Sequence, residues 1–226
     1  MNSGLKKVII IGGQGNGSVI AAAIEDAGSA GQKDWMVAGY LNDRLPAGSE
    51  LEGYPVLGGL AEVQRFLDQD YSFIYTIYRI DGQDRRIALF ESLKIPDERL
   101  AAFIHPRAYV AGSAQIGPGC VIMPHASVSS GVSLGRCCLV MVGATVGHNS
   151  DIGDYCHFAA QSCLGAYLKV GRGVHIGLNA SVRENLTLGE CSVLGMGGVL
   201  LNDMKPYEIW TGAPAKLLRQ AKRELP

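Results

Sequence analysis

Bulky apolar residues recur at every sixth position from Ile104 to Leu200, seventeen times without a break. The full series is Ile104, Val110, Ile116, Ile122, Val128, Leu134, Val140, Val146, Ile152, Phe158, Leu164, Val170, Ile176, Val182, Leu188, Leu194 and Leu200. A fixed short period indicates a solenoid, and a period of six is typical of the hexapeptide parallel β-helix. Because three hexads form one triangular coil in such proteins, we expect residues eighteen apart to stack and the series to point inward.

Small residues fill two further columns of the same repeat. Cys120, Cys138 and Cys156 are eighteen residues apart and stand where other hexads have alanine. We therefore interpret them as an interior stack and not as a metal site. Glycine recurs directly after the apolar position, and this predicts tight corners with positive φ. These glycines are Gly117, Gly135, Gly147, Gly153, Gly165, Gly171, Gly177, Gly189 and Gly195.

The first hundred residues have a different rhythm, in which short apolar runs alternate with helical patterns. The segments are KKVIIIGG, SVIAAAIEDAG, WMVAGYLND, LAEVQRFLD, YSFIYTIY and DRRIALFESL. This βαβαβα order predicts a small parallel sheet with covering helices, half of a Rossmann fold.

Four glycines between Gly12 and Gly17 fall at the first strand-to-helix turn, with the helix expected from about Ser18. Glycines let a backbone approach a phosphate, and a helix N-terminus supplies free N–H groups and a favourable dipole. Asn42 and Asp43 follow the second strand, where such domains often bind a sugar hydroxyl.

Three regions follow from these patterns. Residues 1–100 are predicted to form a Rossmann-like nucleotide-sugar-binding domain, and residues 101–205 the β-helix domain. Residues 206–226 are predicted to form a cap segment that ends in a short basic helix, covering strand edges that the solenoid would otherwise expose.

Composition favours a small-molecule substrate. Lys and Arg number 20 and Asp and Glu 21, so the formal net charge is −1. No broad basic field is available to hold a nucleic acid or an anionic membrane. The chain shows neither a signal-peptide pattern nor an apolar stretch of transmembrane length. We therefore expect a cytoplasmic protein whose six cysteines remain thiols.

The hexads, the segment GHNSDIGDYCHF and the terminal TGAPAKLLR together resemble the left-handed β-helix acyltransferases. With the half-Rossmann domain in front, the chain resembles the bacterial sugar acyltransferases, typified by bacillosamine and perosamine N-acetyltransferases and sialic acid O-acetyltransferases. The resemblance implies a left-handed solenoid and a homotrimer with active sites between subunits. It also implies acetyl-CoA as co-substrate, no metal, and N-acetylation of a nucleotide-linked amino sugar of the 4-amino-4,6-dideoxy type in surface glycan (lipopolysaccharide O-antigen) synthesis.

The family's general base falls on His148, followed by Asn149, and imidazole titrates closest to neutral pH. The family's second histidine falls on His157 and is expected near the acyl carbonyl. Nine residues are half a coil, so His148 and His157 should lie on different sides of the prism and meet only across a subunit boundary.

The resemblance also implies two sets of binding residues. Acyl-CoA contacts are expected at His157, Gly165, Ala166, Leu178, Gly195, Met196 and Lys216. Nucleotide-sugar contacts are expected at Gly13, Gln14, Gly15, Asn16, Asn42, Asp43 and Tyr78, the last in the third strand.

Four positions depart from the family pattern. Asn149 stands where bacillosamine-type enzymes have Glu, Met141 where they have Asn, Asn16 where they have His, and Tyr78 where relatives have Gly. Asn149 can orient the imidazole but cannot compensate its charge.

Other interpretations stay open. O-acetylation of a sugar hydroxyl would use the same base, and a non-catalytic nucleotide-sugar-binding trimer would keep the repeats. A zinc carbonic anhydrase on the same prism needs two histidines five residues apart, a spacing absent from this sequence. His105 and His125 are interpreted as packed or solvated, and His175 as a neighbour stacked on His157.

Overall fold

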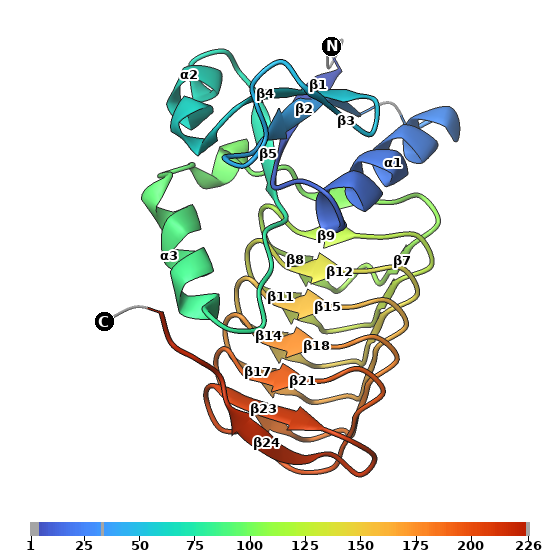
Figure 1. Cartoon of the computed structure of the whole chain (residues 1–226). Helices are drawn as coiled ribbons and strands as arrows, with labels where there is room; N and C mark the ends of the chain where they lie inside the picture. The colour runs from blue at the N-terminus through green and yellow to red at the C-terminus, as the bar shows by residue number, and fades with distance from the viewer. Residues whose placement is uncertain (1–4, 33, 225–226) are drawn as a thin grey trace.

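The computed structural model describes residues 5–32 and 34–224. An α/β domain lies at one end of a long β-helix (Figure 1). The chain that leads into the third α-helix of this domain runs along the side of the β-helix (Figure 1). The expected fold class, a half-Rossmann domain followed by a hexapeptide-repeat β-helix, is confirmed. Within the described residues no helix is long and apolar enough to cross a membrane.

The N-terminal domain is built on a five-stranded sheet with the order β3-β4-β2-β1-β5. Its strands are β1 (Lys6–Ile11), β2 (Trp35–Leu41), β3 (Glu50–Leu51), β4 (Tyr54–Gly58) and β5 (Ser72–Tyr75). Its helices are α1 (Asn16–Ser29), η1 (Leu60–Glu62), α2 (Val63–Leu67), α3 (Gln83–Ser92) and η2 (Asp97–Arg99). Strand β1 is buried on both faces, which explains its unbroken apolar run. The predicted alternation is confirmed, and the β3–β4 hairpin is an addition that the sequence pattern did not reveal.

In the β-helix, each of the seventeen predicted apolar residues is the second residue of a two-residue strand. The strands are β6 (Phe103–Ile104), β7 (Tyr109–Val110), β8 (Gln115–Ile116), β9 (Val121–Ile122), β10 (Ser127–Val128), β11 (Ser133–Leu134), β12 (Leu139–Val140), β13 (Thr145–Val146), β14 (Asp151–Ile152), β15 (His157–Phe158), β16 (Cys163–Leu164), β17 (Lys169–Val170), β18 (His175–Ile176), β19 (Ser181–Val182), β20 (Thr187–Leu188), β21 (Val193–Leu194) and β22 (Val199–Leu200). Parallel pairing joins residues eighteen apart, as in Val128 with Val146, and builds three faces.

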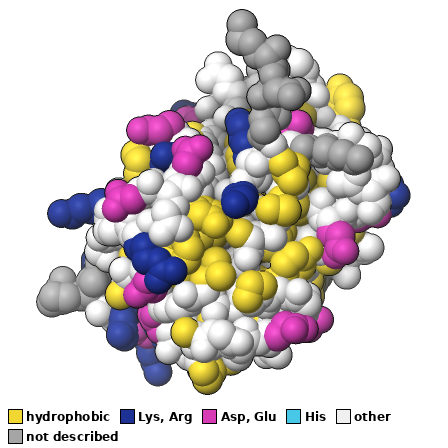
Figure 2. All heavy atoms as spheres, turned by 90° about the horizontal axis from the view of Figure 1, so that it is seen from above, with side chains coloured by type: hydrophobic (Ala, Val, Ile, Leu, Met, Phe, Trp, Pro, Cys, Tyr) yellow, Lys and Arg dark blue, Asp and Glu magenta, His cyan; other side chains and the backbone are white. Residues whose placement is uncertain are grey.

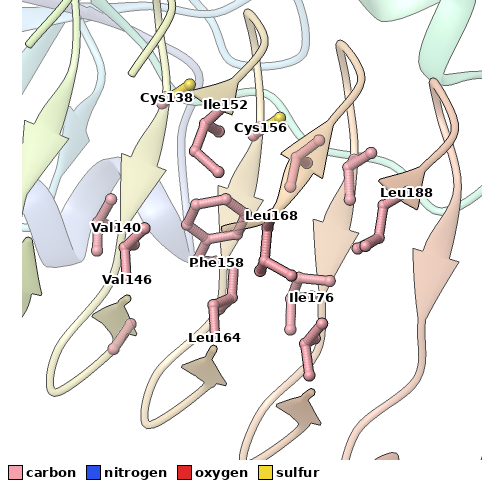
Figure 3. Close-up of a cluster of buried hydrophobic side chains, with 14 of the residues drawn as sticks. Cys138, Val140, Val146, Ile152, Cys156, Phe158, Leu164, Leu168, Ile176 and Leu188 are labelled. Atoms are coloured by element: carbon pink, nitrogen blue, oxygen red, sulfur yellow. The ribbon is translucent and has the colours of Figure 1, made fainter. Parts of the chain in front are cut away.

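The predicted interior is confirmed. The apolar series forms the solenoid core, which includes Phe158 and Ile176 (Figure 3). Both of these side chains are fully buried. The cysteine column lies inside this core, and each thiol donates a hydrogen bond to a glycine carbonyl of the next coil. For example, Cys138 Sγ lies 3.2 Å from the carbonyl oxygen of Gly153. The column is therefore a packing feature whose polar hydrogens are satisfied.

The predicted reason for the corner glycines was wrong. None of them has positive φ; instead a Cβ at Gly147 would lie 2.4 Å from the carbonyl carbon of Gly165 in the next coil. Glycine is needed there because adjacent coils approach closely. Positive φ falls on a different column, every sixth residue from Gly119 to Gly197, where nine residues other than glycine have φ between 53° and 60°. These are His125, Cys137, Asn149, Tyr155, Gln161, Tyr167, Asn179, Asn185 and Cys191.

The predicted C-terminal helix was also wrong. Residues after the last coil form a hairpin of β23 (Glu208–Thr211) and β24 (Lys216–Gln220), and β23 pairs in parallel with β21. The segment has a helical spacing of apolar residues, but its backbone instead pairs with β23. Tertiary pairing overrides the local propensity here.

This hairpin and the chain just after it are tied to the loop that precedes α3 and to the first turn of α3. The Arg219 guanidinium contacts both carboxylate oxygens of Asp81, at 2.7 and 2.9 Å. Arg79 and Arg85 both donate to the carboxylate of Glu224. The loop between β5 and α3 is therefore fixed to the far end of the β-helix.

Candidate active site

A cavity of about 1110 Å³ lies where the parallel strands β1, β2 and β5 end. Its walls are the loops that follow these strands, together with the first turns of α3. Ligands of open α/β sheets bind at this edge. All seven predicted nucleotide-sugar residues, which are Gly13, Gln14, Gly15, Asn16, Asn42, Asp43 and Tyr78, line this one cavity.

The glycine turn is shaped by close contacts. A Cβ at Gly12 would lie 2.1 Å from Thr76 Oγ1. Helix α1 begins at Asn16, two residues earlier than predicted, and Gly15 precedes it with φ of 86°. The backbone N–H groups of Asn16 and Gly17 have no partner among the described residues. They are therefore available to an anion at the helix N-terminus.

Asn42 and Asp43 follow β2, and they differ in whether a side-chain oxygen remains available to a ligand. Asn42 donates from Nδ2 to the Gly12 carbonyl at 2.9 Å and accepts from the Arg44 N–H at Oδ1, so its side chain holds the glycine turn in place. Asp43 accepts from the Leu60 N–H through Oδ1 at 2.7 Å. Its second carboxylate oxygen remains available to a ligand.

Tyr78 closes the cavity against the β-helix. It lies three residues beyond the end of β5, not within the third strand as predicted. Its ring stacks on the imidazoles of His175 and His157, with centroid distances of 4.3 and 4.9 Å. The predicted stacking of the two histidines is confirmed, because they pair in register on β15 and β18. Both histidines are buried beneath the N-terminal domain.

The hydrogen bonds of this stack determine its tautomers. Asn16 Nδ2 lies 3.4 Å from His157 Nε2, and His157 Nδ1 lies 2.9 Å from His175 Nδ1. An amide nitrogen can only donate, so His157 Nε2 accepts and Nδ1 carries the proton that bonds to His175. Burial, with the nearby charge of Arg86, lowers the pKa of His157 to about 3. Both ring nitrogens of His157 are thus engaged in a neutral pair.

His148 lies in a very different environment. It is exposed at the corner between β13 and β14, which belong to two other faces of the prism, whereas His157 is on β15. The predicted placement on different sides is therefore confirmed. His148 Nδ1 lies 2.9 Å from Asn149 Oδ1, and the Tyr167 ring packs edge-on at 5.0 Å. Because an amide oxygen accepts, Nδ1 carries the proton and Nε2 presents its lone pair to solvent.

The predicted acyl-CoA residues lie in separate places along one chain. Ala166 stacks one coil from His148, with Gly165 beside it. Leu178 and Met196 form an exposed column at another corner, where the Met196 side chain is 76% exposed, with Gly195 adjacent. Lys216 is exposed at the start of β24. Within the described residues no cluster of His, Cys, Asp or Glu could hold a metal ion.

Comparison with known proteins gives one family and several structures. The model of the PglD N-terminal domain matches residues 7–79. The acetyltransferase domain of PglB from Neisseria gonorrhoeae, in complex with acetyl coenzyme A, is 28% identical, covers 95% of this chain and 100% of its own, and has a TM-score of 0.81. PerB from Caulobacter crescentus, in complex with CoA and GDP-perosamine, is 26% identical, covers 95% and 98%, and has a TM-score of 0.80. The resemblance to sugar acyltransferases is confirmed. A search of curated proteins gave no match.

Sequence reasoning missed part of the wall of this cavity. Arg79, Arg85 and Arg86 line it, and the last two lie beyond the segment that matches the family model. The pair of arginines at the start of the third helical pattern was a visible signal. This signal is weak, because charged residues are common in the first turn of a helix at a protein surface.

Proposed function

We propose that this chain transfers an acetyl group from acetyl-CoA to the amino group of a nucleotide-linked sugar. The observation that carries the proposal is the cavity, where all seven residues expected to contact a nucleotide sugar converge at the ends of parallel strands. The similar structures support it, because PglB holds acetyl coenzyme A and PerB holds CoA with GDP-perosamine.

The cavity has complementary groups for the nucleotide part. The N–H groups of Asn16 and Gly17 face a phosphate at the N-terminus of α1, where the helix dipole favours negative charge. The free oxygen of Asp43 accepts a hydrogen bond from a ribose hydroxyl. The acceptor sugar is of the 4-amino-4,6-dideoxy type and serves surface glycan synthesis in the cytoplasm.

His148 is the general base. With Nδ1–H donating to Asn149, Nε2 takes a proton from the sugar amine as the amine nitrogen attacks the thioester carbonyl. The new C–N bond forms and the C–S bond breaks. The proton then passes to the leaving CoA thiolate. Backbone N–H groups stabilise the oxyanion that develops on the carbonyl.

The active site lies between subunits of a homotrimer. His148 and His157 occupy different faces of one prism, so they can share a substrate only across a boundary between chains. Acyl-CoA binds at the boundary between subunits, where it is expected to contact Gly165, Ala166, Leu178, Gly195, Met196 and Lys216. Because Tyr78 and Asn16 cover His157, its contact with the acyl group requires these two side chains to move.

Thiol release from acetyl-CoA tests the reaction against a panel of UDP-, GDP- and dTDP-linked amino sugars. His148→Ala should lower turnover by about 10²- to 10⁴-fold with little change in CoA affinity. His125→Asn is the matched control, because His125 is an exposed corner histidine outside the cavity. Unaltered turnover in His148→Ala would remove it from the mechanism.

The product distinguishes the remaining interpretations. An amide survives mild alkali, whereas an ester is hydrolysed, so a labile product would indicate O-acetylation of a hydroxyl. Absence of acyl-CoA binding by calorimetry would indicate a non-catalytic nucleotide-sugar-binding protein.

Mixing subunits tests the shared site. Inactive His148→Ala and His157→Ala trimers are allowed to exchange subunits. A site built from two chains regains activity at interfaces that receive one intact histidine from each. Exchange confirmed by mass spectrometry, without recovery, would reject the interfacial arrangement.

A further inference from the structure

One wall of the cavity holds a buried cation that the proposed reaction does not use. Arg86 lies in the first turns of α3 and is 4% exposed, and it lines the cavity. Its Nε donates to Gln83 Oε1 and its Nη2 donates to the Tyr155 carbonyl at 2.6 Å. The other terminal nitrogen, Nη1, has no partner among the described residues. The guanidinium is thus held in place by two hydrogen bonds, while its other three N–H groups have no partner among the described residues.

No described carboxylate pairs with Arg86. The other two arginines of the wall, Arg79 and Arg85, are more exposed and both pair with Glu224. Burial lowers the pKa of the Arg86 guanidinium, yet an arginine stays protonated in proteins. Burying a charge is strongly unfavourable unless a counter-charge accompanies it. The position of Arg86 therefore indicates a negative charge that arrives with a ligand.

Two further polar groups beside Arg86 lack partners. The Tyr78 hydroxyl and the Gln83 Nε2 are both buried and without a hydrogen bond among the described residues. Tyr78 lines the same cavity, and the Arg86 charge acts on its hydroxyl. All three groups donate hydrogen bonds, and the adjacent histidines His157 and His175 are neutral. The carboxylate that acts on the Tyr78 hydroxyl, that of Asp81, is already paired with Arg219. A buried guanidinium beside a hydroxyl without a partner suits an oxyanion.

The face seen from above does not share this preference for anions. The face of the molecule seen in Figure 2 carries cationic and anionic side chains interspersed among apolar ones, with no field of one sign. An anion that approaches this face therefore meets no field of one sign there, and the buried guanidinium is a cation that lines the cavity without an acidic partner among the described residues.

We propose that the Arg86 guanidinium and the Tyr78 hydroxyl form an oxyanion subsite where the cavity meets the β-helix, with Gln83 holding the guanidinium through its Oε1. The subsite takes a phosphate or a carboxylate group of the sugar substrate. This deepens the proposed function and rests on it, because it assigns a negatively charged group to the part of the substrate closest to His157. Arg86 is then a residue that determines specificity, and its bidentate fork selects the anion.

Calorimetry on the full chain tests the subsite. The probes are inorganic pyrophosphate, UDP, GDP and UDP-glucuronate, with uridine as the uncharged reference. Because a hydrogen bond to a charged group is strong, Arg86→Gln should weaken binding of the charged probes by about 10- to 100-fold and leave uridine unchanged. Arg85→Gln removes the same charge from the same wall, but Arg85 is exposed and paired, so its effect should stay under about 3-fold.

Two sources of the anion give different patterns, both of which support the subsite. Loss already seen with pyrophosphate, UDP and GDP assigns it to the diphosphate. Loss seen only with UDP-glucuronate assigns it to a carboxylate on the sugar, and the acceptor would then be an amino uronate instead of a 6-deoxy sugar. A folded Arg86→Gln protein that binds every charged probe as tightly as the wild type would overturn the proposal.

A second variant guards against misfolding. Tyr78→Phe keeps the ring that stacks on His157 and removes only the hydroxyl, and it should weaken the same probes by about 3- to 10-fold. Wild-type affinity in Tyr78→Phe would exclude the hydroxyl from the subsite. The two proposals fail separately. Normal acetyl transfer with unchanged anion binding in Arg86→Gln would reject the subsite alone, whereas lost anion binding without any transfer by the wild type would reject the enzyme alone.

Discussion

Asn149 offers a sharp test of the proposed base, because its two roles can be separated. Its side-chain oxygen lies 2.9 Å from His148 Nδ1, and its backbone has φ of 56°. Asn149→Gly removes the oxygen while tolerating the backbone angle. Asn149→Ala removes the oxygen and also strains the corner. The pair should therefore agree in turnover and differ in stability.

The magnitudes follow from these two features. A neutral hydrogen bond contributes about 0.5–1.5 kcal/mol and one to a charged group about 1.5–3 kcal/mol. As His148 gains a proton in the transition state, its bond to Asn149 changes from the first class to the second. Losing that gain of about 1 to 1.5 kcal/mol should lower kcat roughly 5- to 10-fold in both variants. The alanine should lose a further ~1–2 kcal/mol of unfolding free energy because of its positive φ.

Steady-state kinetics with acetyl-CoA and urea unfolding together check this reasoning. The KM for acetyl-CoA should stay constant, because Asn149 acts on the imidazole. Asn149→Asp should at least match wild-type kcat, since a carboxylate also compensates the charge that develops on His148. Wild-type kcat in Asn149→Gly would refute the orienting role. Equal stability of the glycine and alanine variants would refute the strain argument.

Three further outcomes are expected. Gly15→Val should raise the KM for the nucleotide sugar and leave that for acetyl-CoA unchanged, because a side chain there blocks approach to the turn; an equal rise in both would indicate misfolding. The free energy of unfolding should fall as pH drops from 6.5 towards 4, because burial lowers the folded-state pKa values of His157 and His175 and the unfolded chain therefore binds the protons. Each histidine should contribute up to about 1.4 kcal/mol per pH unit. Urea unfolding of His157→Phe should show a weaker dependence of this free energy on pH, and an unchanged dependence would contradict the argument. Gly171→Ala should destabilise the solenoid by several times more than Gly112→Ala, since its Cβ would lie 2.6 Å from the Glu190 nitrogen whereas Gly112 faces open space; similar melting temperatures would refute close coil approach as the reason for the glycines.

The solenoid was largely predictable because its apolar residues recur at a fixed spacing of six in the sequence. Each coil contacts mainly its neighbours, so the inward series from Ile104 and the cysteine column follow from local spacing alone. The sugar cavity was predictable for a related reason. The carboxyl ends of parallel strands meet at one edge, which brought the glycine turn, Asn42 and Tyr78 together.

The remainder depends on contacts between distant segments. No spacing rule indicates that β24 pairs with β23 instead of forming a helix. His157 is buried because the N-terminal domain covers that face of the prism. The sequence of the repeat does not indicate which face is covered. Arg86 was missed for the same reason, since its burial results from the packing of α3 against the β-helix.

The register of eighteen residues also governs how this molecule can change in length. One residue inserted within a strand would turn every later inward side chain of that coil outward, so an insertion must either be looped out at a corner or comprise a whole coil. Lengthening or shortening the prism by whole coils at either end leaves His148 and His157 nine residues apart on their separate faces. The six-residue repeat thus fixes the spacing of the two histidines. Changes in the corner loops or at the ends of the prism, where chains usually vary, do not alter it.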